Sequence, residues 1–483
     1  MELLKTGYMG TLSLGWDNYL FLELTGRQER SSTLKDQSFF YPSANLSFLF
    51  SNAFRMPAWW NHGKLRLSYG VVGNAPETYA ANIIYEQGSD NGFTWNYVPS
   101  SWGNANIRPE KKYEYEIGFE SKFLNNRLGF DVSYYNNRVK DQILSTPQPS
   151  TSGVKYVLMN VGEVANEGWD ISVSATPVLT KNFRWDLTAN YGIYRNKVVK
   201  LADGVPYLEI SNIGGGGAKI QAVEGRPMGD IYVQVPQMNE NGEYLVSDKG
   251  LYMNQTELQR VGNINPDGVG GLFSSFSYKN IFLDFSIDFR IGGDVINEMY
   301  QYSTASGLTP ESLQFRDTEH GGLSYYYPGN NNASGVPVQV DPSLGAGPNG
   351  ETVYHDGVIL PGVVASTGEK NTRIIPAGYY YNQTYNWGTQ PEQLTYRHSV
   401  FDNSYVKLRE LTIGYQFPEK LISKLGMTRL SVSVFGRNLF YFYKALKNYD
   451  AESSVGTSWA SQAVVGGSTT ATRNFGVSLR ASF

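Results

Sequence analysis

The sequence predicts an all-β fold: a transmembrane antiparallel β-barrel with long extracellular loops. Three observations predict it. Apolar and polar residues alternate with a period of two, aromatic residues and glycine are abundant, and the connections alternate between short and long. The 483 residues include 35 Tyr, 24 Phe, 9 Trp and 51 Gly, a composition too aromatic for a disordered chain. Because no apolar run reaches about 18 residues, the sequence predicts no transmembrane helix.

Composition and charge exclude several classes of protein. Lys and Arg number 40 against 44 Asp and Glu, so the net charge of −4 lacks the basic excess of a nucleic-acid binder. Cysteine is absent, which excludes disulfides and thiolate metal sites. The four histidines stand far apart, and the glycine run 214–217 lacks the Lys-Ser/Thr of a phosphate loop, so it reads as a flexible loop. We therefore expect no enzyme, with no catalytic residue, metal site or cofactor.

The first four predicted strands cover residues 7–16, 19–28, 39–50 and 63–72. In the fourth strand, Leu65 and Leu67 alternate with Arg66 and Ser68. Because successive side chains of a strand point to opposite faces, this strand has one apolar and one polar face.

The next four predicted strands cover residues 112–123, 127–137, 163–177 and 183–195. In the first of these, Glu114, Glu116 and Glu120 alternate with Tyr115 and Ile117. We expect the three carboxylates to project into the lumen as part of a solvated wall rather than to do acid–base chemistry.

The last five predicted strands cover residues 268–278, 281–292, 403–417, 428–440 and 472–483. The second of these is the clearest, because Leu283 and Phe285 alternate with Asp284 and Ser286. Thirteen strands are thus predicted in total.

The connections between these strands alternate in length. The short ones are 17–18, 51–62, 124–126, 178–182, 279–280 and 418–427, and the long ones are 29–38, 73–111, 138–162, 196–267, 293–402 and 441–471. A transmembrane barrel has short periplasmic turns and long extracellular loops. A soluble β-sandwich or propeller is the alternative, but it gives no reason for every long loop to lie at one end.

The odd strand number carries a further expectation. Single-chain bacterial barrels have an even number of strands and begin and end on the periplasmic side. Thirteen strands that start from the outside fit neither rule, so we expect an odd number of N-terminal strands to lie outside these residues. Because unpaired backbone is costly in hydrocarbon, this chain alone is not expected to form a closed pore.

Short motifs accompany the predicted strands in a fixed order. They are Gly7-Tyr8-Met9-Gly10, the segments 64–74 (KLRLSYGVVGN), 160–169 (NVGEVANEGW) and 224–229 (EGRPMG), then 405–411 (YVKLREL) and 436–439 (GRNL). Each motif is weak alone, but their order and spacing resemble the SusC/RagA-type TonB-dependent transporters of Bacteroidetes outer membranes. The resemblance covers essentially the whole chain.

The resemblance implies a barrel of about 22 strands built around an N-terminal plug. Residues 1–483 would then be the C-terminal portion of the barrel, with the plug, the TonB box and about nine strands outside them. The implied function is import of a nutrient, a glycan or oligosaccharide or a peptide, across the cell outer membrane. The implied partners are outer-membrane lipids, a SusD-like lipoprotein, the TonB complex through the missing N-terminal part, and the barrel-assembly machinery. The alternative is a passive porin-like or adhesin-like surface barrel without energy coupling.

Aromatic residues fall into two groups by position. Those near strand ends, such as Trp16, Trp169 and Trp185, suit the interfacial girdles of a membrane barrel. Others lie in the long loops, where rings and nearby amides can contact a substrate or a lid protein, although packing within the loop is the alternative. These loop candidates are Trp95, Tyr97, Trp102, Tyr326, Tyr379, Tyr380, Tyr381, Tyr385 and Trp387.

The last strand alternates in the same way. Phe475, Val477, Leu479 and Phe483 fall on one face of it. An ordinary lipid-facing strand explains this pattern. The family resemblance adds that a terminal aromatic residue is recognised by the barrel-assembly machinery, so these four residues form the expected assembly signal.

Overall fold

The computed structural model describes residues 3–34, 38–82, 84–147, 151, 153–386, 396–467 and 469–483. Within these residues, thirteen strands form one antiparallel sheet in which the strands lie side by side in chain order. They are β1 (Lys5–Trp16), β2 (Leu20–Ser31), β3 (Ser38–Phe48), β4 (Trp60–Asn74), β8 (Glu110–Phe123), β9 (Leu128–Lys140), β12 (Glu163–Leu179), β13 (Phe183–Lys200), β19 (Gly268–Tyr278), β20 (Ile281–Ile291), β28 (Tyr405–Gln416), β29 (Arg429–Lys444) and β31 (Asn474–Ser482). The predicted number and order of strands are confirmed.

Several strands are longer than predicted, and two of them run furthest past their predicted ends. β13 continues to Lys200 and β29 to Lys444, four or five residues beyond the predicted ends. The added residues lie at the end of the sheet that carries the long loops. There both faces can meet water, so the apolar alternation stops although the backbone ladder continues.

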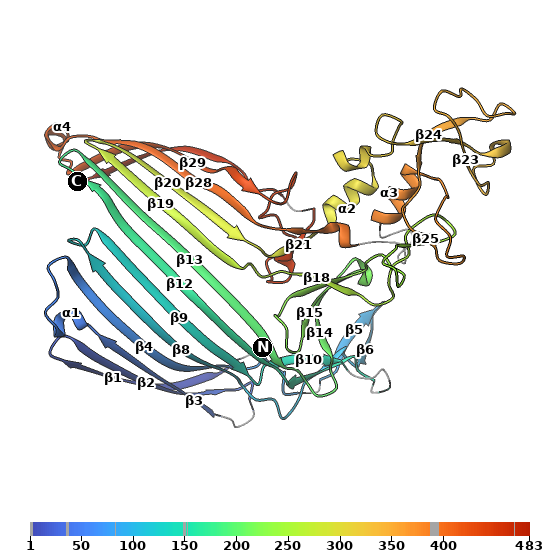
Figure 1. Ribbon diagram of the computed structural model, residues 1–483. Helices are drawn as coiled ribbons and strands as arrows, with labels where there is room; N and C mark the ends of the chain where they lie inside the picture. The colour runs from blue at the N-terminus through green and yellow to red at the C-terminus, as the bar shows by residue number, and fades with distance from the viewer. Residues whose placement is uncertain are drawn as a thin grey trace.

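The sheet is curved into an open trough (Figure 1). Within the described residues β1 pairs only with β2 and β31 only with β29, so these two strands are free edges. The short turns lie along the edge of the sheet at which the C-terminus also lies, and the long connections gather at the opposite end. In the β1–β2 turn, Asp17 and Asn18 both have positive φ, 46° and 56°, as a tight two-residue hairpin requires.

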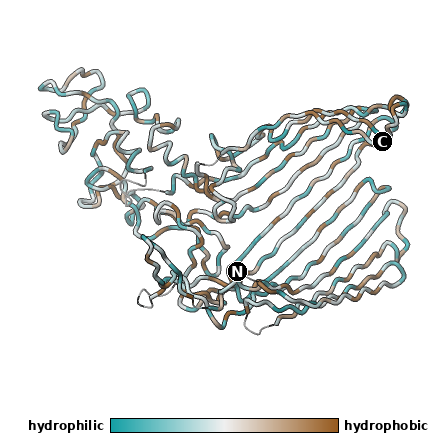
Figure 2. Tube along the Cα trace, turned by 180° about the vertical axis from the view of Figure 1, so that it is seen from behind, coloured by the Kyte–Doolittle hydropathy of each residue, from teal (hydrophilic) through white to brown (hydrophobic). Residues whose placement is uncertain are grey.

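The two faces of the sheet differ in polarity. Register places Leu46, Leu67 and Ile117 of β3, β4 and β8 on one face, and Figure 2 shows apolar and polar residues alternating along the strands. Glu114, Glu116 and Glu120 share the opposite, concave face with Arg66, whose guanidinium pairs with Glu120 at 3.4 Å. A convex apolar face and a concave polar face are what a membrane barrel needs.

Aromatic side chains gather near the strand ends. Trp185 stacks on Phe276 with ring centroids 5.4 Å apart, and its Nε1 donates to Ser274 Oγ at 2.9 Å. Trp169 contacts the ring of Tyr134 at 4.9 Å between centroids, and Trp16 is 68% exposed. These positions support the predicted interfacial belts.

The long connections carry secondary structure of their own. They form the β5–β6 hairpin (Glu86–Asp90, Phe93–Tyr97), a sheet of β10, β11 and β7 (Ile143–Pro147, Tyr156–Asn160, Ser101–Trp102), a sheet of β14, β15, β16 and β18 (Tyr207–Ile213, Ala218–Val223, Asp230–Val233, Gln259–Asn263), the β17–β25 pair (Leu245–Val246, Val363–Val364), a sheet of β27, β21 and β30 (Val400–Asp402, Asp294–Asn297, Val464–Val465) and a sheet of β23, β22, β24 and β26 (Val338–Gln339, Leu323–Tyr326, Val353–Val358, Ile375–Pro376). The helices are short: α1 (Phe50–Ala53), α2 (Glu298–Ala305), α3 (Ala377–Tyr385) and α4 (Glu419–Ile422). Among the described residues, no helix has the length and apolar character needed to cross a membrane.

The largest buried cluster lies in these folded connections. Ile220, Ile231, Ile296 and Tyr396 are fully buried there, contributed by segments that are far apart in sequence. Residues 214–217 are predicted as a flexible loop, but residues 214–216 form a 3-10 turn. Gly214 lies so close to the ring of Tyr396 that a Cβ at Gly214 would be 1.5 Å from the Tyr396 hydroxyl oxygen. The loop end of the protein is therefore a folded cap rather than a set of free loops.

Candidate functional site

The concave face presents a continuous polar wall. Arg66 donates to Asp131 at 2.6 Å across three strands and also to Ser133 at 3.2 Å. Asn137 donates to Glu114 at 3.1 Å, and Asn166 in turn donates to Asn137 at 2.7 Å. These cross-strand bonds hold the polar side chains in fixed positions along the wall.

A groove of about 560 Å³ lies in the middle of this wall. Asp131, Asp170, Asn190, Asp288 and Tyr405 line it, from five different strands. Asp131 and Asp288 pair with arginines, whereas Asp170 has no ion-pair partner among the described residues. The carboxylates, the amide and the phenol that line the groove can hydrogen-bond a polar solute.

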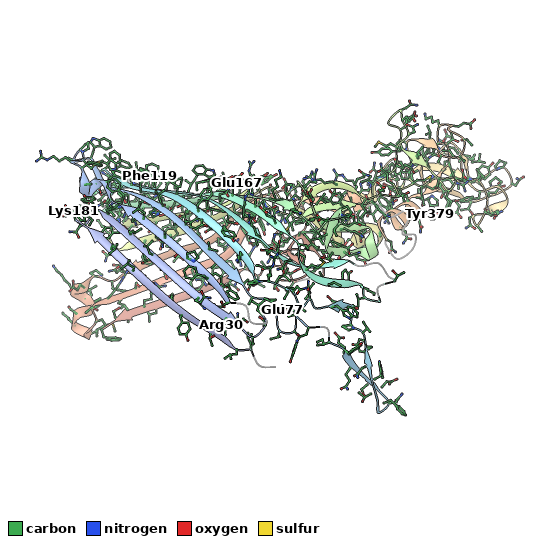
Figure 3. The ribbon with its side chains drawn as sticks, turned by 90° about the horizontal axis from the view of Figure 1, so that it is seen from below. Arg30, Glu77, Phe119, Glu167, Lys181 and Tyr379 are labelled. Atoms are coloured by element: carbon green, nitrogen blue, oxygen red, sulfur yellow. The ribbon has the colours of Figure 1, made fainter. Side chains whose placement is uncertain are left out.

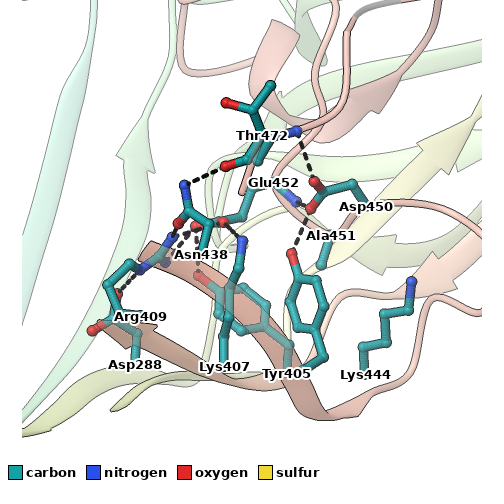
Figure 4. Close-up of polar contacts among 12 residues, drawn as sticks. Asp288, Tyr405, Lys407, Arg409, Asn438, Lys444, Asp450, Ala451, Glu452 and Thr472 are labelled. Atoms are coloured by element: carbon teal, nitrogen blue, oxygen red, sulfur yellow. Dashed lines mark hydrogen bonds and ion pairs between the residues drawn. The ribbon is translucent and has the colours of Figure 1, made fainter. Parts of the chain in front are cut away.

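A network at the outer end of the wall joins the sheet to the final loop (445–473) (Figure 4). Arg409 donates to both carboxylate oxygens of Glu452, at 2.6 and 2.9 Å, and to Asp288 at 2.6 Å. The ammonium group of Lys407 also donates to Glu452, although the Lys407 side chain is only 3% exposed. One carboxylate of the loop thus bridges two cations of β28.

The electrostatics of this network favour an ionised Glu452. Burial acts to raise the pKa of its carboxyl group, but hydrogen bonds from Arg409 and Lys407 outweigh burial and hold that pKa below its usual range. Asp450 completes the loop anchor, since it accepts hydrogen bonds from the Tyr441 hydroxyl and from the backbone N–H of Ala471.

Two of the sequence motifs meet at this point. The motif 405–411 supplies Lys407 and Arg409, and the motif 436–439 supplies Asn438, which accepts from Arg409 at 2.9 Å. The Asn438 side chain also donates to the carbonyl of Thr472 at 3.2 Å. Sequence reasoning missed Asp450 and Glu452, because a carboxylate pair in a loop carries no signal of its own until its partners are placed.

The outer loops contain the predicted contact residues. Trp95 and Tyr97 are 48% and 43% exposed on the β5–β6 hairpin, where the Tyr97 hydroxyl donates to Glu86. Trp102, Tyr326, Tyr379 and Tyr380 are half-buried. Trp387 lies outside the described residues.

Two further candidates point into the cap instead of toward solvent. Tyr381 and Tyr385 of α3 are 4% and 7% exposed and pack together with Tyr300. The Tyr381 hydroxyl donates to the carbonyl of Glu311 at 2.8 Å. Packing within the loop, the alternative given by the sequence, accounts for these two rings in this structure.

The comparisons with known proteins agree with this geometry. The family described as "TonB dependent receptor-like, beta-barrel" matches residues 5–231. Residues 5–231 thus match the β-barrel of TonB-dependent receptors. Proteins of this family lie in the outer membrane, which confirms the expected location.

Relatives and solved structures extend the match over the rest of the chain. TonB-dependent receptor P3 of Formosa agariphila is 22% identical over 469 residues, which is 88% of this chain and 39% of that protein. TonB-dependent receptor SusC of Bacteroides thetaiotaomicron is 27% identical over 256 residues, 46% of this chain and 24% of that protein. The RagAB peptide importer in its closed-closed state has the same fold, with a TM-score of 0.68, 18% identity and coverage of 98% of this chain and 47% of that one. The chain thus spans less than half the length of these relatives.

The buried carboxylate of Glu351 holds backbone segments of the cap together through hydrogen bonds. Glu351 is 2% exposed and accepts hydrogen bonds from the backbone N–H groups of Gly329 and Asn349, at 3.2 and 2.8 Å. The Asn349 backbone bond is the main cause that lowers the pKa of Glu351, to about 2. Within the described residues, no group of three or more His, Asp or Glu side chains could hold a metal ion.

We expect acid to loosen the segment that Glu351 holds. Because its pKa is lower in the folded state, the stabilisation is fully present above the unfolded value near 4.5 and is lost as pH falls toward about 2. The protection of residues 327–351 in the assembled receptor, that is, their hydrogen-exchange rates relative to the intrinsic rates at the same pH, should therefore fall between pH 5 and about 3. Glu351→Gln should show fast exchange already at pH 7, whereas Glu369→Gln, an exposed site in the same cap, should not. Equal protection at pH 5 and pH 3 would contradict this role of Glu351.

Proposed function

We propose that the protein takes part in TonB-dependent import of a nutrient across the outer membrane. The observation that carries the proposal is the continuity of the polar concave wall with a folded cap at one end only. A solute collected by the cap would meet hydrogen-bonding groups along its whole path, while the apolar face stays in lipid. The names of the relatives support energised import over the alternative, a passive porin-like or adhesin-like barrel.

The proposed substrate is a glycan or oligosaccharide or a peptide. Exposed Trp95 and Tyr97 offer ring faces for stacking, and the wall offers amides such as Asn190 for hydrogen bonds. Among the structural neighbours, RagAB is described as a peptide importer. Half-buried Trp102, Tyr326, Tyr379 and Tyr380 remain candidate contacts with the substrate or with a lid.

The proposed partners follow from the same arrangement. A SusD-like lipoprotein would cover the cap, where Leu308 and Val336 are 79% and 63% exposed. Residues 1–483 would be the C-terminal portion of the barrel, and the TonB complex would act through a plug and N-terminal strands in the rest of the protein. Lipids would surround the convex face.

The test is uptake by cells that produce the complete receptor. We expect accumulation of a labelled oligosaccharide or peptide mixture to require both the receptor and TonB. Uptake that needs the receptor but continues without TonB would support the passive alternative. If neither mixture is accumulated, the proposed import function is wrong.

The last strand gives a separate prediction about assembly. Phe475, Val477, Leu479 and Phe483 are each at least 70% exposed on the convex face, as an assembly signal requires. Phe483→Ser should lower the amount of folded receptor in the outer membrane several-fold. Ser482→Ala, one residue away on the other face, should leave it unchanged. Immunoblotting of heat-modifiable receptor measures both, and equal amounts of the two variants would contradict the signal.

A further inference from the structure

Basic side chains gather on the convex face where β8, β9 and β13 reach the cap. They are Lys111, Arg138, Lys140, Arg195 and Lys197, here called the outer basic patch. Arg138, Lys140, Arg195 and Lys197 are exposed. This patch lies outside the concave wall and outside the loops, so import does not account for it.

Register fixes how the patch is laid out. Arg138 of β9 and Lys197 of β13 both lie opposite Ala165 of the intervening strand β12. Two strand spacings separate the two cations, about 10 Å. Between the two cations the face of β12 presents the small Ala165, with Glu163 and Glu167 two residues away on either side. An anion that contacts both cations would lie over Ala165. Arg195 lies two residues along β13 from Lys197 and faces the same side.

Aromatic residues place the patch relative to the membrane. Tyr134 and Trp169 lie opposite each other on β9 and β12, with the apolar Ile171 and Val173 following toward the short turns. Rings of this kind lie at the level of the lipid headgroups. Arg138 is four residues beyond Tyr134 on the same face, roughly 10 Å higher in a tilted strand. The patch therefore lies at the depth of the lipid headgroups and their phosphates in the outer leaflet.

Most of the positive charge in the patch is not neutralised by the protein. Arg138 pairs with Glu163 at 3.0 Å, but Lys111, Arg195 and Lys197 form no ion pair within the described residues. Glu167 lies opposite Arg195 in the register, and Figure 3 shows it on the outer side of the sheet. Asp141 and Asp203 line the pocket beside Lys140, but they pair with Arg108 and Lys200. The five cations of the patch therefore outnumber the carboxylates left to pair with them, Glu163 and Glu167, so the surface where acyl chains meet headgroups is net positive.

We propose that the outer basic patch binds the phosphate groups of a phosphorylated glycolipid of the outer leaflet. Arginine and lysine recognise phosphate through charge-assisted hydrogen bonds. The apolar band below the patch would contact the acyl chains of the same molecule. A lipid is favoured over a free anion, because the patch faces away from the lumen and is continuous with the lipid-facing surface. A bound lipid of this kind would fix the height and tilt of the barrel.

The test uses the complete receptor purified in mild detergent and mixed micelles that contain bisphosphorylated lipid A. Lipid retained after washing is measured by mass spectrometry. The combined variant Arg138→Gln, Arg195→Gln, Lys197→Gln should retain at least fivefold less lipid A than the wild type. The control variant Lys181→Gln, Lys279→Gln removes two cations near the short turns and should retain as much as the wild type.

Two further measurements make the result decisive. The wild type should retain little dephosphorylated lipid A. The amount should be no larger than the amount of lipid A that the triple variant retains. If the triple variant does not show the heat-modifiable mobility of a folded barrel, Lys197→Gln alone should still reduce retention twofold or more. Equal retention of lipid A by the wild type and a folded variant, or equal binding of the dephosphorylated lipid, would overturn the proposal. Neither result depends on whether the receptor imports a nutrient.

Discussion

Replacing Glu452 with alanine is expected to release the final loop from the barrel wall, at a cost of about 3 kcal/mol. Glu452 is the carboxylate that pairs with the buried ammonium group of Lys407. Arg409 keeps a second partner in Asp288, but Lys407 would be left as a buried charge without a carboxylate. Removing one member of a buried ion pair is far costlier than removing an exposed one.

Hydrogen exchange in the assembled receptor measures this effect. In Glu452→Ala, residues 445–466 should exchange on the order of 100-fold faster than in the wild type, the factor that corresponds to about 3 kcal/mol. Glu410→Ala is a matched control, since Glu410 lies on the same strand and pairs with Arg437, which is 57% exposed. That exposed pair should contribute less than about 1 kcal/mol. If the two variants exchange alike, the buried bridge does not hold the loop.

Gly214→Ala is expected to disrupt the centre of the cap by about 3 kcal/mol. Gly214 has φ +58°, which disfavours alanine, and its added Cβ would lie 1.5 Å from the Tyr396 hydroxyl oxygen. Tyr396 is fully buried in the largest apolar cluster and has no room to move aside without opening it. The glycine is therefore required by packing as well as by backbone conformation.

A matched pair of variants separates these two causes. Gly215 has φ +67° but open space at its Cβ, so Gly215→Ala should cost only the backbone strain, about 1 kcal/mol. Tyr396→Phe should partly rescue Gly214→Ala, because the hydroxyl oxygen is the atom nearest the new methyl group. Protease resistance of the cap in the assembled receptor reports each variant. Equal sensitivity of Gly214→Ala and Gly215→Ala would mean that contact with Tyr396 is unimportant.

The sheet was predictable because one physical rule determines every strand. A residue such as Leu67 must face lipid and its neighbour Ser68 must not, so each strand shows its period in the sequence alone. The predicted strands are too short where the strands leave the membrane, because side chains there no longer need to face lipid. Beyond the membrane, the last turns of β13 and β29 are held by backbone pairing that leaves no apolar pattern.

The cap was not predictable for a different reason. Its strands are only two to seven residues long and are joined by distant partners, as where β21 pairs antiparallel with β27 and parallel with β30. The sequence predicted both Tyr381 and Tyr97 as contact residues. In the structure Tyr381 of α3 is buried in the cap, whereas Tyr97 is exposed on the β5–β6 hairpin. Burial depends on segments that meet only in the folded protein, as Glu452 also shows by its bridge to Lys407.

Cysteine labelling in intact cells tests the central claim, a transmembrane barrel with the cap outside and the short turns in the periplasm. Residues 1–483 contain no cysteine, so the signal of each introduced thiol is compared with that of the complete receptor without it. In cells that produce the complete receptor, a membrane-impermeant maleimide should label Phe93→Cys on the β5–β6 hairpin. It should not label Lys181→Cys in the β12–β13 turn until the outer membrane is permeabilised. Labelling of Lys181→Cys in intact cells, or protection of Phe93→Cys, would contradict a barrel with the cap outside the cell and the short turns in the periplasm.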